Sequence, residues 1–156
     1  MEKEFNFVDS NMVSEVEITY KAKCKPSQRP EINDSKDCYD IFLKYWDADK
    51  IEILEQLAVL YLNKRGKVLG LAKLFTGGID VTVADPRIIM VVALKLGATS
   101  MVLAHSHPSG CLTPSTTDIS LTQKIKKGGE FLDIKLLDHL IISAEGYCSF
   151  ADEGLL

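Results

Sequence analysis

The sequence predicts one α/β (α+β) domain, in which a mixed β-sheet is covered by helices. Expected strands and helices alternate along the chain, and several apolar runs are continuous enough for strands buried on both faces. The 156 residues suffice for one domain with a substantial core. A composition of 46% hydrophobic and 26% charged residues excludes wholesale disorder, and a net charge of −4 excludes a globally basic nucleic-acid binder.

The first half is expected to hold a strand, a helix and a hairpin. Period-2 alternation over residues 14–20 predicts a half-buried strand, followed by an extended basic loop over 21–30. Ser35 is the expected N-cap of a helix. One apolar face of that helix is formed by residues at helical spacing: Tyr39, Phe42, Leu43 and Trp46. The apolar run 53–62 predicts a buried strand, with 68–75 as its hairpin partner.

The second half begins with the clearest helix signal. Asp85 precedes a proline, which predicts a helix start, and Gly97 is placed to end the same helix. Residues 100–104 predict a short buried strand. Ser115 resembles the first residue of a capping box and predicts a helix that runs toward the glycines at 128–129. Two last strands are expected at 134–142 and 147–150.

Three side chains around the strand at 100–104 form a candidate metal site. His105 and His107 are two residues apart at a strand end, so both side chains point to the same side. Asp118 falls in the first turn of the next expected helix, where the helix dipole favours an ionised carboxylate. Two histidines and one carboxylate leave a fourth position open, as in catalytic zinc sites. A lone H-x-H pair is more often polar surface.

A metal-activated water needs a proton acceptor, and Glu55 is the candidate. We expect it inside the apolar strand 53–62, where a carboxylate is costly unless it has a partner or a purpose. Glu52 is the alternative if the register is shifted. The Ser115 hydroxyl can cap the helix or donate to a developing oxyanion.

These residues together resemble the JAMM signature E…H-[S/T]-H-x7-S-x2-D of MPN/JAB metalloproteases. The longer string is similar to the RadC branch of that superfamily, in LYLNKRGKVL, F-x-G, DPR, HPSG, TPS, LDH and GYCSF. The resemblance covers roughly residues 35–154. It implies a sheet sandwiched by helices, with a topology similar to cytidine deaminases. It also implies a zinc ion held by His105, His107 and Asp118, with Glu55 as general base and Ser115 as oxyanion donor.

The resemblance also sets the expected function and organisation. It implies a zinc-dependent hydrolase of peptide or isopeptide bonds with a peptide or protein substrate. Residues 35–156 are expected to form the RadC-like MPN/JAMM domain, and residues 1–34 to be part of it or docked on it. RadC proteins commonly have asparagine at the position of Ser106 and begin with a helix-hairpin-helix region, which we expect to be missing here.

Other interpretations stay open at this point. The chain can be a non-catalytic MPN interaction module, or a DNA-repair or mobile-element accessory protein that acts on or near DNA. Asp138 and His139 are expected to support the sheet or the metal ligands, with His139 as a further ligand the alternative. Cys111 is expected to be a free loop thiol, with a thiolate ligand the alternative. No apolar run is long enough for a membrane span and no signal peptide is expected, which favours a cytoplasmic protein. The oligomeric state is left open.

Overall fold

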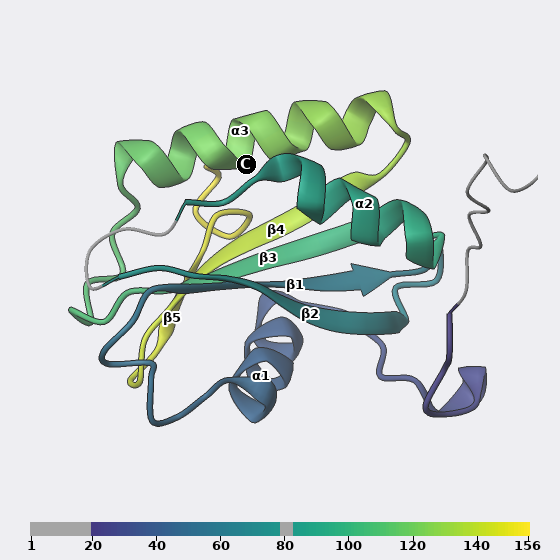
Figure 1. Ribbon diagram of the computed structural model, residues 1–156, viewed down its shortest axis with the longest axis horizontal. Coiled ribbons are helices and arrows are strands. Elements are labelled where there is room, and N and C mark those ends of the chain that lie inside the picture. Colours follow the sequence, from purple (N-terminus) through teal and green to yellow (C-terminus); the bar gives the residue numbers. More distant parts are fainter. Residues whose placement is uncertain (1–19, 79–82) are drawn as a thin grey trace, which may run out of the picture.

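A computed structural model describes residues 20–78 and 83–156. A five-stranded sheet in the order β2-β1-β3-β4-β5 lies between two helical layers. Helices α2 (Pro86–Leu96) and α3 (Thr116–Phe131) cover one face, and α1 (Ser35–Tyr45) covers the other (Figure 1). This arrangement confirms the predicted fold class. The strand expected at 14–20 lies outside the described residues, apart from its last residue.

The sheet is mixed because one of its strand pairs is parallel. Its strands are β1 (Gln56–Leu62), β2 (Val68–Thr76), β3 (Ser100–Ser106), β4 (Lys135–Ile142) and β5 (Tyr147–Ser149). The β1–β2, β1–β3 and β4–β5 pairs are antiparallel, whereas β3 and β4 run parallel. Helix α3 makes the crossover between these two strands, as parallel neighbours require. The N-terminus of α3 therefore lies near the C-terminal end of β3.

Each face of the sheet has its own apolar core. The core under α2 and α3 contains Leu57, Val59 and Tyr61 of β1, together with Leu103 of β3. The core over α1 contains the alternate residues of the same strands, the α1 side chains Cys38 and Phe42, and Trp46, which follows the helix as its C-cap. Because odd-numbered residues of β3 face α2 and α3, His105 points to the side from which α3 approaches.

Local sequence signals set the ends of α2 and α3. The Asp85 carboxylate accepts a hydrogen bond from Arg87 N over 2.9 Å, and Gly97 ends α2 with a left-handed φ of 62°. Ser115 caps α3 in a complete capping box with Asp118. No helix of the described residues is long and apolar enough to cross a membrane.

Three expected boundaries are wrong. Asp34, not Ser35, caps α1, since its side chain accepts from Asp37 N. Strand β1 begins at Gln56 because residues 51–53 form a turn, which places Glu55 just before the strand rather than inside it. Helix α3 continues past the glycines at 128–129.

The basic loop expected at 21–30 contains a short 3-10 helix, η2 (Pro26–Gln28). The segment after η2 joins the β1–β2 hairpin: Val68 N donates to Pro30 O over 2.9 Å, and Ile32 N donates to Gly66 O over 3.0 Å.

Candidate metal centre

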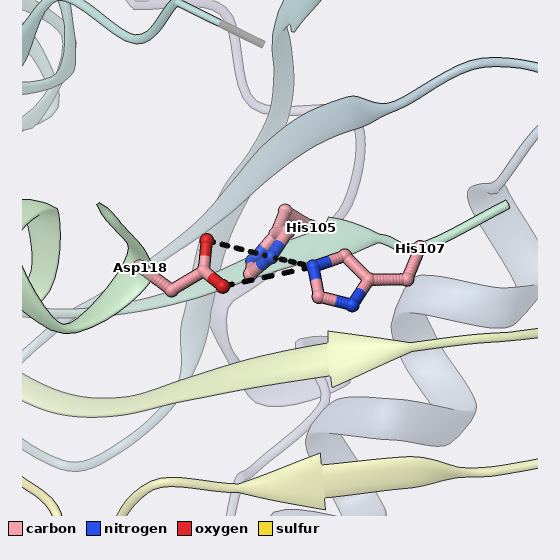
Figure 2. Close-up of side chains that lie close together, drawn as sticks. All are labelled: His105, His107 and Asp118. Atoms are coloured by element: carbon pink, nitrogen blue, oxygen red, sulfur yellow. Dashed lines mark hydrogen bonds and ion pairs between the residues drawn. The ribbon is translucent and has the colours of Figure 1, made fainter. Parts of the chain in front are cut away.

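Strand β3 and helix α3 bring three ligand atoms together at the end of the parallel pair. His105 Nε2 lies 2.8 Å from His107 Nε2 and 3.2 Å from Asp118 Oδ1. His107 Nε2 lies 3.7 Å from Asp118 Oδ2. Figure 2 shows the carboxylate facing both rings. The prediction that these three side chains converge is confirmed.

In both histidines, a neighbouring group is hydrogen-bonded to Nδ1, the outer ring nitrogen, which points away from the cluster. His107 Nδ1 lies 2.6 Å from the Cys111 carbonyl oxygen, which can only accept, so this nitrogen carries the hydrogen. His105 Nδ1 lies 2.8 Å from His139 Nε2 inside the core. The inner Nε2 atoms are thus left to face one another and the carboxylate. Cys111 contributes its carbonyl oxygen, while its free thiol is not a member of the cluster.

Asp118 is both a capping residue and a member of the cluster. Its Oδ2 accepts from Ser115 N over 2.7 Å and from Ser115 Oγ over 2.6 Å, and its own N–H donates back to Ser115 Oγ. Burial opposes its ionisation, but the hydrogen bond and charge of His105 and the hydrogen bonds from Ser115 outweigh burial. The pKa of Asp118 therefore falls well below its ordinary value, and the carboxylate is charged at neutral pH.

This donor set fits a metal ion. Two nitrogens bound to one tetrahedral zinc ion lie about 3.3 Å apart. The ligand atoms of the three residues are separated by 2.8, 3.2 and 3.7 Å, on both sides of that value. Small side-chain shifts therefore suffice to place one atom of each residue around one zinc ion. With hydrogens on the outer ring nitrogens, the inner lone pairs and a carboxylate converge on one point. A positive charge at that point offsets their repulsion, supplied either by a proton on His105 that is shared with Asp118 or by a metal ion in its place.

Glu55 is not a member of the cluster of three candidate ligands. It is half-buried, and its backbone extends the β1–β2 pairing through hydrogen bonds with Gly77 N and Gly78 O. Leu57, two residues on, pairs with His105 across β1 and β3. The Ser106 hydroxyl also accepts from Gln56 N and donates to Leu54 O, each over 3.1 Å. Strand β3 thereby holds the backbone on both sides of Glu55.

A polar pocket of about 210 Å³ opens beside His107. It lies between the turn that precedes β1, the loop after β3 and the β4–β5 turn. Its lining residues include Glu52, Ser109, Ser143 and Glu145. The alternative base Glu52 thus faces a space next to the candidate metal ligands, while Glu55 lies closer to β1.

Sequence reasoning missed Thr122 and left the role of His139 undecided. Both are fully buried, and Thr122 Oγ1 lies 2.6 Å from His139 Nδ1. Burial, and then the charge of His105, keep the pKa of His139 well below its ordinary value, so its ring is neutral. Thr122 follows Asp118 by four residues, which puts both on one helix face. That spacing was the available signal.

Asp138 has a separate, structural task. Its Oδ1 accepts from His139 N and Ala151 N, and its Oδ2 accepts from Ser149 Oγ. These bonds fasten the chain after β5 to β4. Burial outweighs them and raises the pKa of Asp138.

Comparison with known proteins agrees with this geometry. A family model described as a RadC-like JAB domain matches residues 32–155. A UPF0758 protein of Flavobacterium johnsoniae is 50% identical over 101 residues, which cover 65% of this chain and 44% of that protein. A UPF0758 protein of Porphyromonas gingivalis is 48% identical over 103 residues, which cover 65% and 45%. The matched region spans less than half the length of these relatives.

Proposed function

Because the chain belongs to the RadC-like JAB domain family, we propose that it is a zinc-dependent hydrolase of peptide or isopeptide bonds. The observation that carries this proposal is the convergence of two histidine Nε2 atoms and an ionised carboxylate, with both outer ring nitrogens already hydrogen-bonded. His105, His107 and Asp118 would hold the zinc ion. Zinc, when bound, lowers the pKa of a coordinated water to near neutrality and polarises a carbonyl group.

The residues around the ligands supply the remaining chemistry. Glu55 would accept the proton of the attacking water and pass it to the leaving amine; the half-buried position of Glu55, two residues before the β1 residue that pairs with His105, supports this role. The Ser115 hydroxyl rotates from Asp118 Oδ2 to donate to the developing oxyanion. The polar pocket beside His107 offers room for the peptide chain of a substrate. The four cysteines are free thiols, which fits the cytoplasmic location that we propose.

The first test measures metal in the purified protein by elemental analysis, with His107→Ala as the control. Wild type should hold one zinc ion per chain after reconstitution and dialysis, and His107→Ala should hold much less. If the wild type retains no stoichiometric zinc, the proposed metal site is wrong.

The second test compares Glu55→Gln with Glu52→Gln on peptide and isopeptide-linked substrates. Both variants should bind zinc like the wild type. Glu55→Gln should lose at least a hundredfold in kcat/KM, because general-base catalysis contributes about 10²–10⁴-fold, whereas Glu52→Gln should keep its activity. The opposite pattern would assign the base to Glu52. Zinc binding without hydrolysis of either substrate class would favour a non-catalytic interaction module.

A further inference from the structure

A line of three hydrogen bonds, two of them buried and one partly buried, connects two of the candidate ligands. His105 Nδ1 lies 2.8 Å from His139 Nε2, and His139 Nδ1 lies 2.6 Å from Thr122 Oγ1. The Thr122 hydroxyl also lies 2.6 Å from the carbonyl oxygen of Asp118, one helical turn earlier. His105 belongs to β3, His139 to β4 and Thr122 to α3, so these hydrogen bonds join three elements that meet at the site.

The direction of these bonds follows from the available hydrogens. A carbonyl oxygen only accepts, so the single hydroxyl hydrogen of Thr122 is donated to Asp118 O. Thr122 Oγ1 must then accept from His139, whose Nδ1 carries a hydrogen. The His139 ring is completely buried, which disfavours a second ring hydrogen and the charge it brings. Its Nε2 therefore carries no hydrogen and accepts from His105 Nδ1.

We propose that His139 and Thr122 are positioning residues that hold the hydrogen of His105 on Nδ1 and keep its Nε2 available for a metal ion. This inference rests on the metal site proposed above. The opposite direction, with a hydrogen on His139 Nε2, would place the hydrogen of His105 on the nitrogen that faces Asp118. Partners that fix the ring nitrogen of a ligand in this way typically change metal affinity by about 10–100-fold.

The surroundings leave His139 little freedom to adopt another arrangement. Its side chain is completely buried and stacks on Phe150, with ring centroids 4.9 Å apart and an interplanar angle of 25°. Thr122 is also completely buried on the inner face of α3. The rings therefore keep their orientation, and the hydroxyl of Thr122 selects which nitrogen of His139 carries the hydrogen.

The direct test determines the tautomer of His139 in the metal-free wild-type protein. Long-range ¹⁵N–¹H correlation spectra distinguish ring nitrogens with and without a hydrogen, and the chain has only three histidines to assign. The proposal requires a hydrogen on His139 Nδ1 and none on Nε2. A hydrogen on Nε2 would overturn it, even if the protein binds zinc. The expected tautomer in a chain that binds no zinc would support the hydrogen-bond direction while refuting the proposed function.

The second test uses Thr122→Val, which keeps the shape but lacks the hydroxyl, and Thr122→Ser, which keeps the hydroxyl. Competition with a chromophoric chelator gives the zinc affinity, and thermal unfolding shows that each variant is folded. Thr122→Val should bind zinc about tenfold more weakly and shift His139 toward the Nε2–H tautomer. Thr122→Ser should retain wild-type affinity and tautomer. A folded Thr122→Val variant with unchanged affinity and tautomer would overturn the proposal.

Discussion

Two adjacent glycines in α3 allow a sharp test of how closely this helix packs on the sheet. A Cβ atom on Gly129 would lie 2.3 Å from Ile134 O and 3.5 Å from Met101 Cε. A Cβ atom on Gly128 would meet only the flexible end of Met90, at 3.4 Å. The two alanine variants therefore make the same chemical change in different surroundings.

The expected magnitudes follow from these distances. Either alanine gains about 1 kcal/mol of helix propensity over glycine. In Gly129→Ala, the backbone must move by roughly 1 Å to reach normal van der Waals separation, and such overpacking costs about 3 kcal/mol. The net result is a loss of about 2 kcal/mol for Gly129→Ala and a gain of about 1 kcal/mol for Gly128→Ala. The two variants should differ by about 6–12 °C in Tm.

Thermal unfolding followed by circular dichroism measures both variants against the wild type. The predicted order of Tm is Gly128→Ala, wild type, Gly129→Ala. A Gly129→Ala variant as stable as Gly128→Ala would refute the close approach of α3 to the residue that precedes β4.

Three further predictions concern single side chains. Asp118→Asn should abolish stoichiometric zinc retention in dialysis yet change the free energy of unfolding by less than about 1 kcal/mol, because the amide oxygen can still accept from the helix N-terminus. Tyr61→Phe should cost about 1 kcal/mol in urea unfolding, since its buried hydroxyl donates to Ile89 O over 3.0 Å; no change would contradict that bond. The pKa of Asp138 is higher in the folded protein than its value of about 4 in the unfolded chain. The contribution of Asp138 to the free energy of unfolding is therefore fully present below about pH 4. It is lost as the pH rises through the folded-state pKa. As the pH rises from 4 to 7, the free energy of unfolding of Asp138→Asn should therefore increase relative to that of the wild type. A difference between the two proteins that stays constant over this range would contradict a raised pKa for Asp138.

Much of the fold could be predicted because its signals are local. The ends of α2 depend on Asp85 and Gly97, whose side-chain and backbone preferences act within one helical turn. The capping box of Ser115 and Asp118 is equally local. The start of β1 was missed because Ile53 and Leu54 extend the apolar run of the strand, although both lie before it and Ile53 belongs to a turn.

The candidate ligands of the site could be predicted, whereas their supporting contacts could be predicted only in part: His139 was expected to support the sheet or the ligands, and Thr122 was missed. His105, His107 and Asp118 follow from spacing along one stretch of chain. The contact between Thr122 and His139 instead joins α3 to β4, and no pattern within either element specifies it. A threonine on an inner helix face has many ordinary uses, including the hydrogen bond to the preceding turn.

The placement of the ligands in one short segment has a consequence for folding. A metal ion bound by His105, His107 and Asp118 closes only the loop between the end of β3 and the start of α3, so little chain entropy opposes it. An unfolded chain would therefore still chelate the proposed zinc ion weakly, which would lessen the stabilisation that zinc confers on the native state. His139 comes from β4 and contacts His105 only once the non-local β3–β4 pairing is complete. Tight zinc binding during refolding would thus report the completion of the parallel strand pair.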